Sequence, residues 1–232
     1  MPANRPDILQ VLAAYRAEVL RWNTQINLVS RRDTEAQLDA LILQCDNALA
    51  ALQAASAALS AGPLLYCDLG SGGGLPGVVW HARLAAAGRL AATWLVEPRD
   101  KRAWFLQRVA RQLPKPELQA ACARWGDVEA DGLGGAESAL VSLKALRLSD
   151  PEVLAGLETL HGAATPPRQV VIARFHPGDA VLTPSLADEL RIVPPGRTVG
   201  PWVATGARVV PVPAGPYPAA ALVVSSYGPA PA

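Results

Sequence analysis

The chain has 232 residues and a net charge of +1, from 21 basic and 20 acidic side chains, so no overall basic balance marks it as a nucleic-acid binder. Half of its residues are hydrophobic and 18% are charged, which excludes a disordered chain and suits one sizeable core. No apolar run approaches the roughly 20 residues of a membrane span, and residues 1–6 lack a signal peptide's apolar core. We therefore expect a cytoplasmic protein without a membrane partner, and a monomer.

Two amphipathic helices are predicted before the first strand. Asp7 and Gln10 resemble a capping box ahead of a helix over about 7–22, and Thr34 and Gln37 repeat the pattern ahead of a second helix that ends before residue 62. We expect an N-terminal helical cap over residues 1–62 and an α/β domain over 63–232, joined in one compact unit.

From residue 64 onward, strand and helix patterns alternate. The predicted strands are 64–69, 92–97, 118–122, 139–143 and 169–173, and the predicted helices are 75–87, 100–113 and 151–160. Repeated β–α–β units of this kind predict a doubly wound, mostly parallel sheet. Two short β-branched runs at 208–212 and 221–225 predict a hairpin that adds an antiparallel last strand.

The remaining segments give weaker signals. Residues 182–206 are rich in Pro and Gly, and for them we expect a short helix near 185–191 and a loop over the active face. Cys45, Cys67 and Cys122 are widely spaced, so they indicate neither a disulfide framework nor a metal site, and are expected to be small buried hydrophobes.

A glycine-rich turn after the first strand carries the clearest functional signal. The sequence Tyr66-Cys67-Asp68-Leu69-Gly70-Ser71-Gly72-Gly73-Gly74-Leu75-Pro76-Gly77 is an apolar run that ends in an acid and breaks into glycines. Such a turn brings bare backbone close to a nucleotide-like cofactor. The spacing satisfies both the dinucleotide fingerprint and the S-adenosylmethionine pattern, and an ordinary Gly-rich turn is a third interpretation.

S-adenosylmethionine is the favoured cofactor. A dinucleotide needs a helix N-terminus with free donors for its pyrophosphate, and Pro76 removes one of them. S-adenosylmethionine has no phosphate, and its cationic groups suit a nearby carboxylate such as Asp68. The expected cofactor-binding residues of this turn are Asp68, Gly70, Ser71, Gly72, Gly74 and Leu75.

Two further strand ends are expected to contact the cofactor, because ligands bind at the carboxyl ends of parallel strands. Glu97 follows the second strand about 20 residues after the glycine turn, where an acid accepts hydrogen bonds from both ribose hydroxyls. The turn with Trp125, Gly126 and Asp127 follows the third strand, where Asp127 would accept from the adenine amine. The competing interpretations are a solvated strand-end acid and an ordinary turn acid.

The residues also resemble a known family. Trp22-Asn23-x-x-x-Asn27-Leu28, Arg32-Asp33, the glycine turn with its Leu-Pro-Gly ending, and Lys101-Arg102-x-x-Phe105-Leu106 together resemble the 16S rRNA guanine-N7 methyltransferase family (RsmG, also called GidB) over about residues 8–127. The resemblance implies a class I S-adenosylmethionine-dependent methyltransferase fold with two N-terminal helices. It also implies action on a guanine N7 of small-subunit rRNA.

The departures from the family fall on the substrate side. The family's Arg-His-x-x-Asp-Ser motif is replaced by Ala40, Leu41, Gln44 and Cys45, and its Ser-Arg-Ala step becomes Ser142-Leu143-Lys144-Ala145. We expect the substrate contacts to come from four residues at the fourth and fifth strand ends: Ser142, Lys144, Arg174 and His176. Replacing Lys144 or Arg174 by Ala is expected to abolish turnover without changing cofactor affinity. A relative retargeted to a small molecule and a non-catalytic cofactor-binding relative remain alternatives.

Contacts with RNA would come from a local surface. Seven basic residues are candidates for binding its phosphates: Arg31, Arg32, Arg99, Lys101, Arg102, Arg108 and Arg111. The alternative interpretation is an ordinary solvent-exposed face. Among the tryptophans, Trp125 and Trp202 are expected in loops where a base can stack, whereas Trp80, Trp94 and Trp104 are expected in the core or a pocket.

Overall fold

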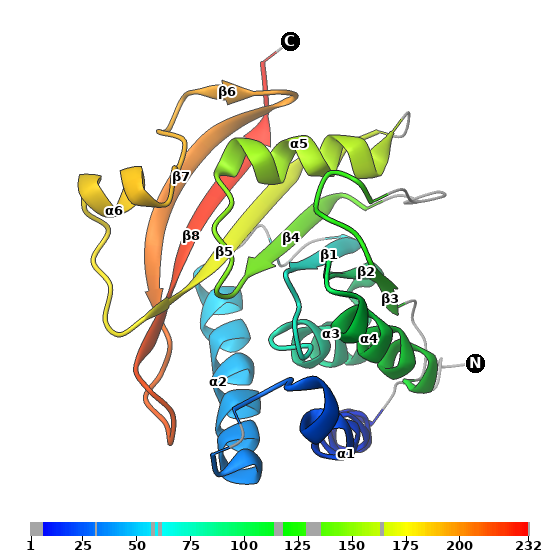
Figure 1. Ribbon diagram of the computed structural model, residues 1–232. Helices are drawn as coiled ribbons and strands as arrows, with labels where there is room; N and C mark the ends of the chain where they lie inside the picture. Colours follow the sequence, from blue (N-terminus) through cyan, green and yellow to red (C-terminus); the bar gives the residue numbers. More distant parts are fainter. Residues whose placement is uncertain are drawn as a thin grey trace.

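In the part of the chain that the computed structural model describes, which is residues 7–30, 32–56, 59, 62–113, 118–128, 136–162 and 165–231, eight strands form one sheet (Figure 1). The sheet order is β3-β2-β1-β4-β5-β8-β7-β6. The strands are β1 (Leu64–Leu69), β2 (Leu90–Val96), β3 (Leu118–Ala121), β4 (Ser138–Leu143), β5 (Gln169–Pro177), β6 (Thr198–Val199), β7 (Trp202–Pro211) and β8 (Ala220–Pro229).

The sheet combines a parallel half with an antiparallel edge. Strands β3, β2, β1, β4 and β5 run parallel, and β8 pairs antiparallel with both β5 and β7. Strand β1 is central, so Asp68 lies opposite Leu95 of β2 and Ser142 of β4. The predicted doubly wound, mostly parallel sheet with an antiparallel last strand is confirmed.

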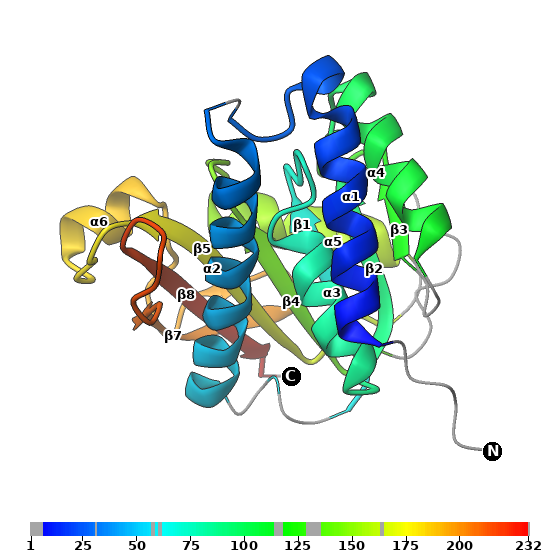
Figure 2. The same cartoon turned by 90° about the horizontal axis from the view of Figure 1, so that it is seen from below.

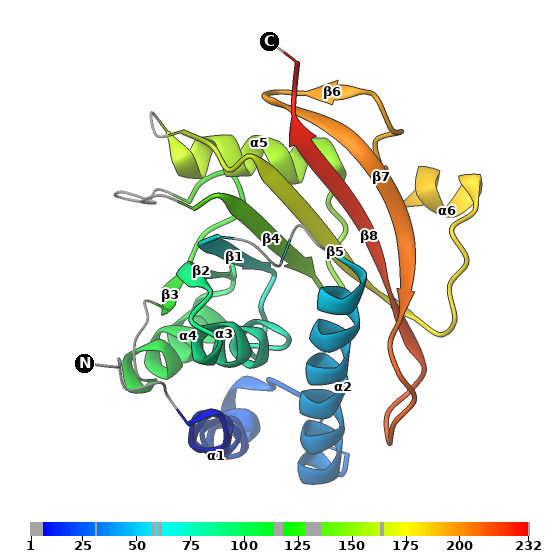
Figure 3. The ribbon, with the colours of Figure 1, turned by 180° about the vertical axis from the view of Figure 1, so that it is seen from behind.

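Helices cover both faces of this sheet. The helices are α1 (Ile8–Ile26), α2 (Thr34–Ala55), α3 (Gly77–Ala86), α4 (Asp100–Gln112), α5 (Asp150–His161) and α6 (Pro184–Glu189). Figures 1 and 2 show α1 to α4 together on one face and α5 on the other, with α6 beside β7. Figure 3 shows α2 crossing the sheet near β8. No helix of the described segments is both long and apolar enough to cross a membrane.

Side chains of β1 point alternately to the two faces of the sheet, so this strand contributes to the hydrophobic core on each face. Leu65 and Cys67 pack toward α5 with Leu157, whereas Leu64 and Tyr66 pack toward α2 and α3. All six residues of β1 are buried, as expected for a central parallel strand. A third cluster joins α1, α3 and α4, and it contains Val11, Tyr15, Val19, Val78 and Phe105. The N-terminal helices therefore share their cores with the sheet's own helices.

Several local predictions were wrong. The Thr34–Gln37 capping box does not form, because α2 starts after Asp33, which has a φ of 49° and no side-chain cap bond. Thr34 Oγ1 instead donates to the Ser30 carbonyl at 3.3 Å. Trp202 is not in a loop: it lies in β7, is 1% exposed, and donates to the Pro167 carbonyl at 2.8 Å. Cys122 is exposed rather than buried.

Candidate functional site

The turn after β1 is a left-handed glycine bend that closes over the neighbouring strand. Gly70, Gly72 and Gly74 have φ values of 69°, 56° and 97°, which side chains other than glycine rarely adopt. The amides of Gly70 and Ser71 both donate to the Val96 carbonyl, at 2.8 and 3.1 Å. The turn is therefore fixed against the end of β2.

Asp68 lies beneath this turn and holds it to α3. Its carboxylate is 1% exposed; Oδ2 accepts from the Gly77 amide at 3.2 Å and Oδ1 accepts from Ser142 Oγ at 2.5 Å. Ser142 Oγ also lies 2.9 Å from the hydroxyl of Tyr66. Burial raises the pKa of Asp68 to about 6, although hydrogen bonds from Ser142 and other donors oppose the rise. Direct contact between Asp68 and a cofactor's cationic groups stays a prediction.

The start of α3 offers few free donors to a phosphate. Pro76 has no amide hydrogen, the Gly77 amide is bound to Asp68, and the Val78 amide donates to the Gly74 carbonyl at 2.8 Å. A pyrophosphate needs such donors, so the geometry suits a cofactor without phosphate better than a dinucleotide.

Glu97 has the position expected of a ribose ligand. The side chain is 3% exposed and lies directly after β2. Oε2 accepts from the Gly72 amide at 2.9 Å, and Oε1 accepts from the Arg99 amide at 3.0 Å. A carboxylate oxygen has two lone pairs, so each oxygen can accept a second hydrogen bond from a hydroxyl. The glycine turn and Glu97 together fit S-adenosylmethionine.

The turn after β3 is anchored to α5. Trp125 Nε1 donates to the Val153 carbonyl at 3.0 Å, and its indole occupies the space above Gly156, where an added Cβ would lie 2.1 Å from Nε1. Gly126 has a φ of 98° with open space around it, and Asp127 is exposed. Trp125 thus positions the turn, and the expected adenine contact of Gly126 and Asp127 stays a prediction.

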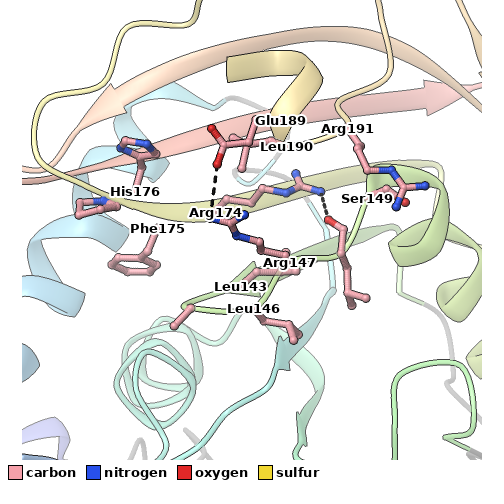
Figure 4. Close-up of a pocket in the computed structure, with 13 residues that line it drawn as sticks. Leu143, Leu146, Arg147, Ser149, Arg174, Phe175, His176, Glu189, Leu190 and Arg191 are labelled. Atoms are coloured by element: carbon pink, nitrogen blue, oxygen red, sulfur yellow. Dashed lines mark hydrogen bonds and ion pairs between the residues drawn. The ribbon is translucent and has the colours of Figure 1, made fainter. Parts of the chain in front are cut away.

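A cavity of about 430 Å³ lies at the carboxyl ends of β4 and β5 (Figure 4). Residues 145–149 form one wall, residues 174–177 of β5 form the next, and residues 189–191 at the end of α6 line a third side. The short helix predicted near 185–191 forms as α6, whose end lines this cavity, but part of the predicted loop belongs instead to β6 and to the start of β7. His176 lines the cavity, and its Nδ1 is buried without a hydrogen-bond partner in the described structure.

The structure changes the role expected of Arg174. Its guanidinium is 5% exposed and forms an ion pair with the fully buried Asp150 at 2.5 Å. It also donates to the Leu148 carbonyl at 3.1 Å and to Ser225 Oγ at 3.3 Å. These contacts join β5, α5 and β8, so loss of turnover on replacing Arg174 by Ala would report on folding. Ser142 is likewise a buried support of Asp68.

Lys144 is the substrate-side candidate whose charge is not used in an ion pair within the described segments. Its side chain is half-buried after β4, with Nζ 5.4 Å from the centre of the Phe175 ring. No acid in the described segments forms an ion pair with it. Burial raises the pKa of Asp68 to about 6 and that of Cys45 to about 12, and the positive charge of Lys144 opposes both rises. His176 lines the cavity at the ends of β4 and β5, whereas Lys144 is not among its lining residues. A substrate role for either residue stays a prediction.

Helix α1 contacts the glycine turn directly, which the sequence did not reveal. The hydroxyl of Tyr15 in α1 donates to the Gly73 carbonyl at 2.7 Å in a buried bond. Asn23, which is 3% exposed, accepts from the amides of Leu28 and Val29 at 2.8 and 2.9 Å. Helical periodicity places Tyr15 on the buried face of the first helix, but it could not identify the partner in the glycine turn, 58 residues away.

Two residues of the predicted basic surface already bind other groups of the protein. Arg108 bonds to Glu18 at 2.6 Å, and Arg102 donates to the Asn27 carbonyl at 3.2 Å. Arg32, Arg99, Lys101 and Arg111 are exposed, and Arg31 lies outside the described residues. The other histidines are packed: His81 Nδ1 lies 3.0 Å from Thr93 Oγ1, and His161 Nδ1 lies 2.9 Å from the Leu157 carbonyl.

Comparison with known proteins agrees with this geometry. The family model described as rRNA small subunit methyltransferase G matches residues 8–140. The chain belongs to this family. Two relatives, each named ribosomal RNA small subunit methyltransferase G, come from Granulibacter bethesdensis and Bordetella avium. They are 40% and 39% identical over 111 and 114 residues.

These matches are partial. They cover 48% and 49% of this chain and 46% and 48% of the two relatives, so the chain spans about half the length of the relatives it matches. An S-adenosylmethionine-dependent methyltransferase from Leishmania major shares the fold, with a TM-score of 0.50 at 12% identity over 95% of this chain and 86% of that one. The segment that matches the family model, residues 8–140, includes the glycine turn and Glu97. The residues that line the cavity at the ends of β4 and β5 all follow that segment.

Proposed function

We propose that this protein is an S-adenosylmethionine-dependent methyltransferase whose acceptor is N7 of a guanine in small-subunit rRNA. The observation that carries the proposal is the glycine turn joined to the buried carboxylate of Glu97, inside the segment that matches the family. The relatives' printed names support the ribosomal RNA substrate.

The residues of the site suit this reaction. S-adenosylmethionine supplies an electrophilic methyl group when bound. Guanine N7 has an in-plane lone pair and needs no deprotonation, so the protein has only to place it in line with the methyl group. Glu97 holds the ribose hydroxyls, the glycine turn brings backbone close to the cofactor, and Lys144 and His176 orient the acceptor.

A small-molecule acceptor is the second candidate function. The cavity of about 430 Å³ is lined by residues of β5, of the loop after β4 and of the end of α6, and a space of this size suits a small substrate as well as an extruded base. In addition, α2 carries Leu41 and Cys45 where the family motif has polar residues, and Cys45 is fully buried.

Methyl uptake from labelled S-adenosylmethionine tests the proposal. We expect label in the RNA of isolated small ribosomal subunits, at a position that is cleaved by treatment specific for 7-methylguanine. Label in a small-molecule extract, with none in the subunits, would favour the second candidate.

Two variants separate the cofactor from the acceptor in this assay. Glu97→Ala is expected to weaken S-adenosylhomocysteine binding about 10- to 100-fold in calorimetry, because it removes a charged acceptor worth about 1.5–3 kcal/mol. Lys144→Ala is expected to lower turnover while leaving that affinity unchanged. Tighter binding of NAD than of S-adenosylhomocysteine would contradict the cofactor assignment.

A further inference from the structure

Trp104 is an exposed aromatic side chain on an otherwise polar helix face. It is 41% exposed, and its ring meets that of Trp22 edge to face, with centroids 4.8 Å apart and planes at 77°. Trp104 lies on one stripe of α4 with Lys101, Arg108 and Arg111, at spacings of three, four and seven residues. It does not belong to the buried clusters, so packing alone does not account for it.

A hollow accompanies this aromatic pair. It has a volume of about 360 Å³ and lies where α1 and α4 run side by side (Figure 2). Its walls are Trp22, Gln25, Ile26, Asp100, Lys101 and Trp104. Two indole rings, one aliphatic side chain, one amide, one ammonium group and one carboxylate thus line the same space.

Basic side chains outnumber acidic ones around the hollow. The guanidinium groups of Arg21 and Arg108 each lie 5.6 Å from the centre of the Trp22 ring. Glu18 is bound by Arg108 at 2.6 Å and by Arg21 at 3.9 Å, and the Arg108 hydrogen bond is the main cause of its lowered pKa. Asp100 accepts the thiol hydrogen of Cys122 at 3.2 Å, and the Lys101 side chain is exposed. The rim is therefore basic on balance.

We propose that Trp22 and Trp104 form a stacking site for one unpaired base of an RNA, and this inference rests on the proposed RNA substrate. Trp104 offers its exposed ring to the base, Gln25 can hydrogen-bond to the base edge, and Lys101 and Arg21 can bind the adjacent phosphates. Basic side chains around an accessible indole match the charge of a single strand, which is why we choose RNA over a protein or a second copy of the chain.

The hollow is linked to the cofactor side of the molecule through α4. This helix begins three residues after Glu97, whose Oε1 accepts the Arg99 amide at the helix start. Arg102 of the same helix donates to the Asn27 carbonyl at the C-terminal cap of α1. The hollow shares no lining residue with the cavity at the ends of β4 and β5, so a base stacked on Trp104 would not be the acceptor base itself.

Fluorescence anisotropy with a labelled adenylate decamer tests the inference. Trp104→Ala is expected to weaken binding about tenfold or more, because base–aromatic stacking contributes about 1–3 kcal/mol per base. Trp104→Phe should retain most of the affinity. The matched control is Leu43→Ala, which removes a side chain that is 40% exposed on α2 and should change nothing. An abasic decamer separates stacking from phosphate binding, and it should bind weakly and respond little to Trp104→Ala.

The outcomes separate this inference from the proposed function. Equal binding of the decamer by the wild type and Trp104→Ala would overturn the inference, as would equal binding of the abasic and base-bearing decamers. Absence of any decamer binding by the wild type at low salt would also overturn it. In each case, methylation of small ribosomal subunits by the wild type still decides the proposed function. Unchanged S-adenosylhomocysteine affinity in Trp104→Ala shows that the variant is folded.

Discussion

Asp68 shows how burial makes one carboxylate sensitive to pH. Its folded pKa of about 6 exceeds the ordinary value of 3.8, so between about pH 4 and 6 the folded chain keeps a proton that the unfolded chain has lost. Because the folded state binds more protons, stability falls as pH rises through this window and stays lower above it. A shift of about two pKa units corresponds to about 3 kcal/mol.

Asp68→Asn should remove this contribution. In urea unfolding, the free energy of unfolding of the variant relative to the wild type should increase by up to about 3 kcal/mol between pH 4 and pH 7.5. The difference between the two proteins isolates Asp68 from the other titrating groups. Parallel pH profiles for the two proteins would contradict the assignment.

Three residues show where reasoning from the sequence succeeded and where it failed. Glu97 was placed correctly at the end of β2, because a strand pattern fixes where a strand ends. Arg174 looked like a substrate contact because it follows a strand, yet its partner Asp150 is 24 residues earlier and only the packing of α5 brings them together. Trp104 could have been identified as exposed, since its helical spacing puts it on the stripe of Lys101 and Arg111.

The connection between β1 and α3 depends on glycine for space as well as for conformation. A Cβ on Gly77 would lie 2.5 Å from Leu95 Cδ2 and 2.6 Å from Asp68 Oδ2. Both neighbours are buried at the centre of the sheet, so neither can move freely. The close approach of α3 to β1 and β2 therefore requires glycine here.

Gly77→Ala should lower the free energy of unfolding by about 1–3 kcal/mol, the usual cost of forcing an extra methyl group into a packed site. Gly206→Ala is the matched control: an added Cβ there meets nothing within 4 Å, so the change should be neutral or slightly stabilising. Urea denaturation of both variants measures this. Equal stability of the two would show that the turn rearranges to accept the methyl group.

The lengths of β5, β7 and β8 depend on hydrogen bonding between strands, which a local sequence pattern cannot predict. The fifth strand was predicted to end at residue 173, but β5 continues to Pro177 because Phe175, His176 and Pro177 pair with β8. Strands β7 and β8 were predicted as runs of five residues, and each has 10. Proline and glycine lowered the local signal, whereas neighbouring strands supplied the hydrogen bonds.

Across the whole molecule, the features that could be predicted depend on local sequence patterns, and the features that could not depend on tertiary packing. Family resemblance and hydrophobic periodicity were sufficient for the order of elements, the glycine turn and the two N-terminal helices. The cavity at the end of α6, the Arg174–Asp150 pair and the contact between α1 and the turn join segments far apart in the sequence. Such contacts follow from the packing of the complete fold.

The bond from Tyr15 to Gly73 joins α1 to the cofactor turn. If the cofactor orders this turn, S-adenosylhomocysteine should slow hydrogen exchange in both residues 70–78 and α1. Tyr15→Phe removes the hydroxyl and leaves the buried Gly73 carbonyl unpaired, at a cost of about 1–3 kcal/mol in stability. In this variant the added protection should persist in the turn and diminish in α1.

Hydrogen exchange followed by mass spectrometry measures both segments in one experiment. Tyr217→Phe is the matched control, because its hydroxyl also donates to a backbone carbonyl, that of Pro213, but in the hairpin between β7 and β8. That variant should keep the wild-type response in α1. If cofactor addition leaves exchange in α1 of the wild type unchanged while the turn is protected, α1 is not coupled to the turn. The bond from Tyr15 would then serve stability alone.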